Sequence, residues 1–321
     1  MPELTSVSII IATRDRAEHL RGTLCSFNHV TVPDRYVVEL IVVDNGSTDD
    51  TKEVVNQCVL DGYSIRYLFE PVKVKSRAIN RAHEMAAGDI LLFTDDDVRP
   101  APNWISAMCQ PIVSGRADAV VGSVTLAPHL VKPWMRLRHR KWLAELTFSD
   151  REIALTDEIM LVGANMGYAR KVLERVKDFD PELGAGALGF YEETLFGLQV
   201  AHAGFRIVPV PESEVEHHFD ANRATSKVLR TASAKIGQSK AYVDYHWRHM
   251  RGRTFPLLLA LTSIDLAVAG IGCVFNGGEV TERELQLTMW AGYYRQFMSY
   301  KQQPRHYERH GLVKIAANTS P

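Results

Sequence analysis

The chain has 321 residues, and its 37 Lys and Arg residues nearly balance its 38 Asp and Glu residues, for a formal net charge of −1. At about 150 residues per domain, this length predicts one large domain or two modest ones. Hydrophobic residues make up 46% of the chain, which excludes disorder over most of it. The near-neutral charge excludes a nucleic-acid binder that depends on overall basicity.

The four cysteines and the N-terminus indicate the cellular compartment in which the protein lies. The cysteines lie far apart and contain no C-x-x-C pair, which argues against a disulfide framework or a thiolate zinc site and favours a reducing compartment. The N-terminus has no basic segment followed by a long apolar one, so we expect no signal peptide. Together these features predict a cytoplasmic protein.

Short apolar runs alternate with helical patterns over the first hundred residues. Apolar spacing predicts helices over residues 17–27 and 74–87. Another helix is expected near residue 50, with Ser47 or Thr48 as its cap. The apolar runs are rich in Val and Ile, as in strands that are buried on both faces. They predict strands at residues 7–12, 37–43, 65–69 and 90–94.

This alternation predicts an α/β fold with a mostly parallel sheet flanked by helices. Further strands are expected at residues 120–126 and 207–210, and beyond about residue 225 the pattern is mainly helical. We therefore expect a first domain over residues 1–225 and a helical C-terminal region over residues 226–321.

One apolar stretch, residues 254–275, is long enough to cross a bilayer. Asp265 lies at its centre, where a carboxylate is costly, and Pro256, Gly270 and Gly272 weaken it as a helix. A buried or surface-docked hairpin and a membrane contact remain open as readings of this stretch, and a true membrane span is the less favoured one.

Polar clusters follow three of the predicted strands. Thr13 and Arg16 follow the first strand, Asp44 ends the second, and residues 95–97, three aspartates, follow the fourth. Because parallel strands end at one edge of a sheet, these clusters should converge there. Adjacent carboxylates repel one another, so a cation would stabilise them, and carboxylate oxygens suit Mg²⁺ or Mn²⁺ together with substrate phosphates. The sequence therefore predicts a metal–diphosphate site.

Three later motifs carry weaker signals. Residues 184–189 satisfy G-x-G-x-x-G, but no strand precedes them, so we interpret them as a loop and not as a dinucleotide fingerprint. Glu192 and Glu193 begin a predicted helix, where acids are common because of the helix dipole, although a carboxylate there could also act as a general base. His217 follows a predicted strand and is a candidate to complete a metal site.

Taken together, these motifs resemble the family 2 glycosyltransferases, which have the GT-A fold. The matching segments occur in the family's order over roughly residues 5–220 and are VSIIIATRDR, ELIVVDNGSTDDT, KSRAINRAHEMAAGDILLFTDDDVRP, GANMGYARKVLERVKDFDPELG and YEETLFGLQVAHAGFRIVPVPESEVEHH. The resemblance implies an inverting enzyme that depends on Mn²⁺ or Mg²⁺ and moves a sugar from a nucleoside-diphosphate donor, a UDP-sugar by default, to a hydroxyl of a glycan or lipid-linked acceptor.

The resemblance also implies roles on the donor side. Asp95 and Asp96 would face the ribose and the diphosphate, and Asp97 would hold the divalent ion with His217. The residues implied to contact the base and ribose of the nucleotide are Thr13, Arg16, Asp44 and Arg77.

On the acceptor side, the resemblance implies a catalytic base at Glu193, where the family usually has the Asp of a Glu-Asp pair. This departure leaves open which of Glu192 and Glu193 takes the proton. Asn165 would border the acceptor and is a hydrogen-bonding candidate. From the sequence itself, Trp134 or Trp142 is a candidate to stack on an acceptor sugar.

Residues 132–142 hold Lys and Arg residues between two tryptophans, which is typical either of a solvated helix face or of a contact with an anionic surface. The second reading predicts peripheral attachment to the inner face of the cell membrane. Two other functions remain as alternatives. A nucleotidyltransferase of related fold would need a Gly-rich phosphate loop after the first strand, which residues 13–16 lack. An inactive relative that serves as a binding subunit is disfavoured by the intact acidic clusters.

Overall fold

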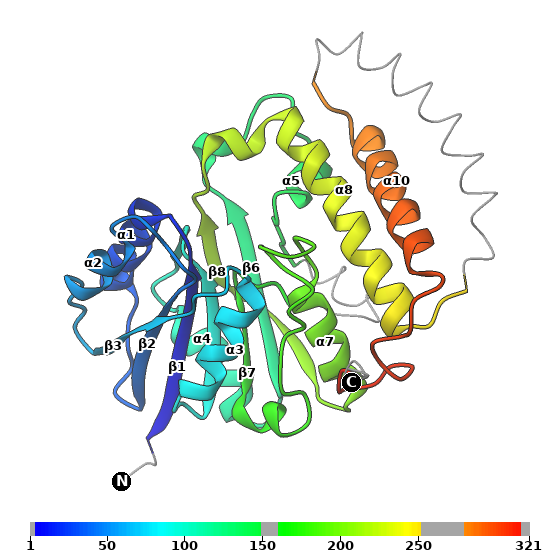
Figure 1. Cartoon of the computed structure of the whole chain (residues 1–321). Helices are drawn as coiled ribbons and strands as arrows, with labels where there is room; N and C mark the ends of the chain where they lie inside the picture. The colour runs from blue at the N-terminus through cyan, green and yellow to red at the C-terminus, as the bar shows by residue number, and fades with distance from the viewer. Residues whose placement is uncertain (1–3, 149–159, 252–278, 316–321) are drawn as a thin grey trace. The chain divides into compact units, whose positions relative to one another are not determined.

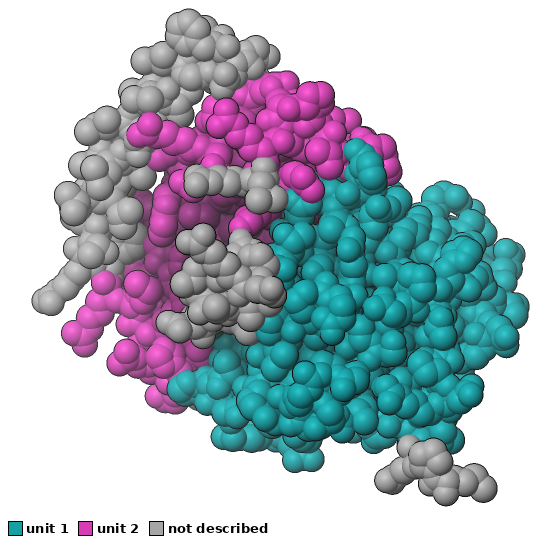
Figure 2. Space-filling view, turned by 180° about the vertical axis from the view of Figure 1, so that it is seen from behind, with its two compact units in different colours: residues 1–128, 144–181, 192–219 teal, residues 129–143, 182–191, 220–321 magenta. Residues whose placement is uncertain are grey.

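The computed structural model describes residues 4–148, 160–251 and 279–315, and these form two compact units. Unit 1 comprises residues 1–128, 144–181 and 192–219, and unit 2 comprises residues 129–143, 182–191 and 220–321. Figure 2 colours unit 1 teal and unit 2 magenta. The α/β class predicted from the sequence is confirmed, because unit 1 is built on a sheet and unit 2 is helical (Figure 1).

Eight strands of unit 1 form one sheet in the order β3-β2-β1-β4-β7-β6-β8-β5. The first four are parallel to one another, and β7 and β5 run antiparallel to their neighbours. The sheet is therefore mostly parallel, as predicted. The strands are β1 (Thr5–Thr13), β2 (Tyr36–Asp44), β3 (Tyr63–Phe69), β4 (Ile90–Asp95), β5 (Val98–Pro100), β6 (Ala119–Leu126), β7 (Met166–Ala169) and β8 (Ile207–His217).

Helices of unit 1 cover both faces of this sheet, which is why its central strands are almost continuously apolar. On one face, alternate residues of β1 share a core with side chains of α1 and α4. On the other, Phe93 of β4 packs against His83 of α3 and stacks on Tyr168 of β7. The helices are α1 (Ala17–Ser26), α2 (Thr51–Asn56), α3 (Lys75–Met85), α4 (Trp104–Val113) and α7 (Glu192–His202), and short 3-10 turns lie at Phe27–His29, Pro128–Leu130 and Arg170–Glu174.

The turn after β2 corrects one expectation. Helix α2 begins at Thr51, and neither Ser47 nor Thr48 caps it. Their hydroxyls are used elsewhere, because the Ser47 hydroxyl accepts the Asp15 N–H at 2.9 Å and the Thr48 hydroxyl bonds to the Asp15 carboxylate at 3.1 Å. The two side chains therefore tie this turn to the loop after β1 and do not start the helix.

The pairing of β6 with β8 contains a bulge. Gly122 pairs with Val210, whereas the next residue, Ser123, pairs with Glu214. Residues 211–213 of β8 are thus left out of the ladder. The register resumes and continues to His217, which ends the strand.

Unit 2 is held together by two helices that run in the same direction. They are α8 (Ser226–Tyr242) and α10 (Glu282–Tyr300), and a short helix α5 (Leu137–Lys141), a 3-10 turn (Ala221–Ala224) and a π-helical turn (Val243–Trp247) complete the unit. Glycines allow the two long helices to approach closely, since a Cβ at Gly237 would overlap the Met289 carbonyl, and one at Gly292 would overlap the Ala234 carbonyl.

The apolar residues 254–275 lie outside the described residues. Within the parts of the chain that are described, no helix has the length and apolar character needed to cross a bilayer. The expected attachment to a membrane surface stays a prediction.

We predict that Gly237→Ala lowers the melting temperature. Alanine normally stabilises a helix relative to glycine, but here the added methyl group meets backbone atoms of α10, and such overpacking costs about 1–3 kcal/mol. Thermal unfolding followed by circular dichroism measures the change. Thr231→Ala, at an exposed position of the same helix, is the control and should shift stability by less than about 0.5 kcal/mol. A Gly237→Ala protein as stable as this control would contradict the close approach.

Candidate active site

The predicted polar clusters lie at the carboxyl edge of the parallel strands of unit 1. β4 ends at Asp95, which pairs in register with Ala12 of β1, and the next β1 residue, Thr13, pairs with Asp44 at the end of β2. Since parallel strands end at the same edge, segments far apart in the sequence bring their polar side chains together here.

Asp96 and Asp97 are buried, and Arg16 pairs with both. The Arg16 guanidinium lies 2.8 Å from Asp96 Oδ1 and 2.7 Å from Asp97 Oδ2. The Thr13 hydroxyl donates to Asp96 Oδ2 at 2.6 Å. Burial raises the pKa of Asp96 to about 6, because the loss of hydration and the neighbouring Asp97 outweigh the attraction of Arg16. The cluster still carries excess negative charge, so a further cation would stabilise it.

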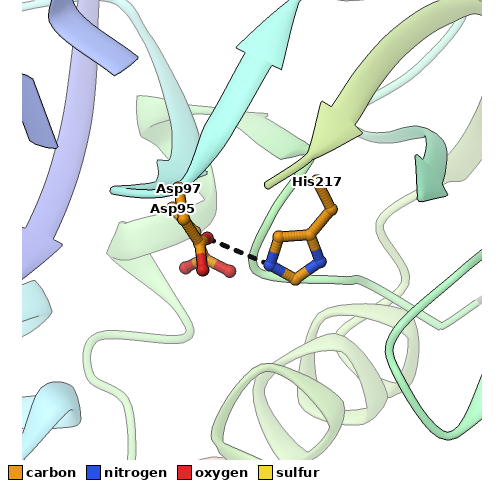
Figure 3. Close-up of side chains that lie close together, drawn as sticks. All are labelled: Asp95, Asp97 and His217. Atoms are coloured by element: carbon orange, nitrogen blue, oxygen red, sulfur yellow. Dashed lines mark ion pairs between the residues drawn. The ribbon is translucent and has the colours of Figure 1, made fainter. Parts of the chain in front are cut away.

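Asp95, Asp97 and His217 form a candidate metal site (Figure 3). Each offers one ligand atom, and these atoms lie within 4.8 Å of one another. His217 Nε2 lies 3.0 Å from Asp97 Oδ1, and its other ring nitrogen is buried with no hydrogen-bond partner in the described part of the chain. Two carboxylates and an imidazole are a donor set that suits Mn²⁺ or Mg²⁺. The residues present therefore fit a divalent ion, with Asp95 added to the pair expected from the sequence.

Strand pairing explains why His217 reaches the acidic cluster. β8 ends at His217, which pairs with Val98 at the start of β5, the residue that follows Asp97. The backbone N–H of His218 also donates to the Asp97 carbonyl at 2.6 Å. The histidine is thus positioned by backbone hydrogen bonds, and its position does not depend on a flexible loop.

Lys75, at the start of α3, is a cation of the site that the sequence analysis missed. Its Nζ lies 2.8 Å from Asp95 Oδ1 and 3.9 Å from Glu192 Oε1. Burial works to lower the pKa of Lys75, but the attraction of these carboxylates raises it above its ordinary value. Burial likewise works to raise the pKa of Asp95, and Lys75 holds it below its ordinary value. Lys75 therefore joins the aspartate cluster to the glutamates of α7.

Glu193 lies in the first turn of α7 and lines the same small cavity as Asp95, Lys75 and Glu192. The cavity has a volume of about 10 Å³, which holds about one water molecule or one hydroxyl group. Glu193 Oε2 is buried and has no hydrogen-bond partner among the described residues. Burial and repulsion by Glu192 raise the pKa of Glu193 well above its ordinary value. These properties are typical of a carboxylate that accepts a proton from a bound group.

Asp44 and Arg77, which are both expected to contact the nucleotide, differ in their exposure to solvent. Asp44 is buried at the strand edge, where Oδ1 accepts the Ser47 N–H and Oδ2 accepts the Tyr67 hydroxyl, both at 2.7 Å. Arg77 is exposed in the first turn of α3. The structure thus places Asp44 within the edge cluster and Arg77 on the surface of the helix that carries Lys75.

The two residues expected at the acceptor do not line the cavity of Asp95 and Glu193. Asn165 is fully buried, and its side-chain oxygen Oδ1 accepts the Trp104 indole N–H at 2.9 Å. Its amide nitrogen donates to the carbonyls of Ser123 and Ser213 at 2.8 and 3.1 Å. These bonds use its polar atoms to join β6, β8 and α4. Trp134 belongs to unit 2 and is described with that unit below.

Thr23 is a second residue that the sequence analysis missed. It is fully buried in α1, and its hydroxyl donates to the Asp96 carbonyl at 2.7 Å and accepts the Val98 N–H at 3.2 Å. It therefore holds the turn that carries Asp96 and Asp97. A polar residue on the buried face of a helix was the signal that could have identified it.

Comparison with known proteins decides the family. The model of glycosyl transferase family 2 matches residues 8–177, which is more than half of the chain. The chain belongs to glycosyl transferase family 2. This stretch contains the ends of β1, β2 and β4, and so most of the acidic cluster.

Curated relatives match over shorter stretches. Glycosyltransferase AglE of Haloferax volcanii is 34% identical over 122 residues, which cover 38% of this chain and 40% of that protein. Succinoglycan biosynthesis protein ExoA of Rhizobium meliloti is 28% identical over 123 residues, 37% of each chain. This family 2 chain therefore spans about two fifths of the length of these relatives.

The fold also has counterparts among solved structures. A mannosyltransferase, PcManGT from Pyrobaculum calidifontis, in complex with GDP-Man and Mn²⁺, aligns with a TM-score of 0.62 at 17% identity, over 94% of this chain and 89% of that one. GalNAc-T7 with UDP, GalNAc and Mn²⁺ aligns with a TM-score of 0.51 at 16% identity, over 76% and 50% of the two chains. The GT-A fold expected from the sequence is thereby confirmed.

We predict that Lys75→Met destabilises the protein more at pH 8 than at pH 5.5. Without the ammonium group, the nearby carboxylates lose a buried cation, so their pKa values in the folded state rise above those in the unfolded chain. Their ionisation then opposes folding as the pH increases, by about 1–3 kcal/mol at pH 8.

Melting temperatures measured across this pH range test the prediction. The control is Lys171→Met, which removes a lysine that pairs with Asp118 at 2.6 Å but is more exposed. Equal losses at both pH values for Lys75→Met would show that Lys75 does not neutralise the glutamates and Asp95.

Proposed function

We propose that this protein is a glycosyltransferase that moves a sugar from a nucleoside-diphosphate donor to a hydroxyl group of a glycan or lipid-linked acceptor. One observation carries the proposal: Asp95 belongs both to the candidate metal site with Asp97 and His217 and to the small cavity that Glu193 lines. A place for a diphosphate and a place for a hydroxyl therefore adjoin each other. Membership of family 2 and the Mn²⁺ and nucleotides named for its structural counterparts support this reading.

The metal residues are assigned by their donor atoms. Asp97 and His217, with Asp95, would hold Mn²⁺ or Mg²⁺. When bound, the ion would neutralise negative charge on the leaving nucleoside diphosphate. The protein residues fix the ligand positions through the β5–β8 pairing and the Thr23 contacts.

The donor nucleotide is assigned to the edge formed by β1, β2 and β4. Thr13 and Asp44 end neighbouring strands there, and Arg16 already pairs with Asp96, which leaves a guanidinium beside the place for the diphosphate. Arg77 is retained as a contact from the surface of α3. A UDP-sugar is the default donor.

Glu193 is assigned as the base. Its raised pKa, caused by burial and by Glu192, makes its carboxylate a stronger base than an ordinary glutamate. As the acceptor oxygen attacks the anomeric carbon, its proton passes to Glu193, and the bond from the sugar to the diphosphate breaks on the opposite face. The product configuration is therefore inverted. Glu192 sits between Glu193 and Lys75 and helps to set the charge of the base.

We expect Glu193→Gln to reduce transfer by about 10²- to 10⁴-fold, because the amide cannot accept the proton. Release of nucleoside diphosphate from a panel of donors with Mn²⁺ measures turnover, and calorimetry checks that donor binding is kept. Glu192→Gln, in parallel, separates the two glutamates, and Glu212→Gln, at an exposed position of β8, is the control for removal of a carboxylate. Near-normal turnover by Glu193→Gln would refute the assignment.

We also expect Asp97→Asn to lose the effect of Mn²⁺ on binding of the nucleoside diphosphate. Removal of one charged ligand should weaken metal-dependent affinity by more than about tenfold. Calorimetry with the diphosphate in the presence and absence of Mn²⁺ measures this, and Asp61→Asn, at an exposed turn, is the control. If the wild-type protein itself bound the diphosphate equally with and without Mn²⁺, the metal site would be ruled out.

A further inference from the structure

Unit 2 contains a pocket of its own. Its volume is about 380 Å³, within the range of small-molecule binding sites. Among the described residues, its lining comes from two segments of unit 2: Trp134, Arg136 and His139 in one, and residues 279–283 at the start of α10 in the other. The lining residues are Trp134, Arg136, His139, Glu279, Val280, Thr281, Glu282 and Arg283.

The charges in this pocket balance. Arg136 and Arg283 offer hydrogen-bond donors, and Glu279 and Glu282 offer acceptors. A ligand with a net negative charge would meet two carboxylates, and a ligand with a net positive charge would meet two guanidinium groups. A neutral ligand whose groups both donate and accept hydrogen bonds fits this lining better, and hydroxyl groups have this property.

Trp134 gives the pocket an aromatic wall. Its indole is half-buried and is held edge-to-face against His139, with ring centroids 5.4 Å apart. The face of an indole is electron-rich and apolar, so it attracts the weakly positive C–H face of a sugar ring, while the ring's hydroxyls point to polar neighbours. A fixed tryptophan beside alternating donors and acceptors thus matches a saccharide.

His139 is a buried residue beside the same wall. The side chain is 6% exposed, and its Nδ1 accepts the Arg136 N–H at 3.1 Å. Burial lowers the pKa of His139, although Glu282 and a hydrogen bond to the Val280 backbone oppose this. Because its ring bonds to the backbone of both segments that line the pocket, His139 holds them together beside Trp134.

Other ligand classes fit less well. Among the described residues that line the pocket, Trp134 and Val280 are apolar and the other six are polar or charged, which favours a polar ligand over an acyl chain. The start of α10 favours an anion through its backbone N–H groups, but Glu282 and Glu284 lie in its first turn and offset that field. Phosphate is therefore the principal competitor, and it serves as a comparison ligand in the test.

We propose that this pocket binds a neutral sugar residue of the acceptor glycan, stacked on Trp134 and hydrogen-bonded by Arg136, Glu282 and Arg283. The proposal rests on the proposed function for the identity of the glycan as acceptor. Binding of the sugar itself depends only on residues of unit 2 and can be measured without any transfer reaction.

The test uses the full chain without donor or metal. Neutral tetrasaccharides of glucose, galactose and mannose are titrated, and binding is followed by saturation-transfer NMR and by calorimetry. We expect at least one of them to bind, and Trp134→Ala to weaken that binding at least tenfold while Trp134→Phe recovers part of it. Arg283→Ala, at an exposed position, gives a second pocket variant that disturbs no core packing.

Three controls separate the possible results. Trp142→Ala removes another half-buried tryptophan of the same segment that does not line the pocket, and it should leave binding within about twofold of the wild type. Glu193→Gln should also bind the tetrasaccharide normally, so loss of transfer and loss of sugar binding are distinguished. Inorganic phosphate is titrated in parallel with the sugars.

The results of this experiment either support or overturn the proposal that the pocket binds a sugar. Tetrasaccharide binding that depends on Trp134 and Arg283 but not on Trp142 supports the proposal, even if no donor were ever turned over. Failure of every tetrasaccharide to bind, binding that is unchanged in both Trp134→Ala and Arg283→Ala, or binding of phosphate alone would overturn it.

Discussion

Buried negative charge at the end of β4 is the constraint on which the site depends. Of three consecutive aspartates there, Asp96 and Asp97 are buried and Asp95 is partly buried. Ionised groups in such a place are costly unless cations or hydrogen bonds compensate them. Compensation comes from separate parts of the chain: Arg16 after β1, Lys75 at the start of α3, and His217 at the end of β8. The electrostatics therefore hold together elements that are distant in the sequence.

The same charge arrangement divides the site into two functional halves. Arg16 and His217 face Asp96 and Asp97, whereas Lys75 faces Asp95 and the glutamates of α7. A diphosphate and its ion belong to the first half, and a hydroxyl that loses a proton belongs to the second. Asp95 belongs to both halves, so its side chain lies at the boundary between them.

Much of this architecture could be predicted from the sequence, because it depends on local pattern. Buried parallel strands are recognisable as short runs of Val, Ile and Leu, and the acids that follow β4 mark the carboxyl edge of the sheet. The antiparallel strands β5 and β7 were not anticipated, since they have three and four residues and carry no periodic signal of their own. Tertiary pairing alone makes them strands.

The side chains of the site also divide into those that a sequence pattern predicts and those that only tertiary packing positions. Asp97 and His217 were predicted together because a family pattern marks both of them. The role of Lys75 was missed because a lysine at the start of a helix usually faces solvent, and only the packing of α3 against β1 turns it inward. Asn165 carries a further role that its motif does not indicate, since its side chain joins three elements of the core.

The bulge in β8 has a consequence for how such a chain can change during evolution. Residues 211–213 are left out of the ladder with β6, while the pairs that follow them set the position of His217. A change in the number of residues within the bulge leaves these pairs intact, and the histidine keeps its alignment with Asp97. The unpaired residues 211–213 are therefore the place in β8 where chain length can vary while the inherited chemistry is preserved.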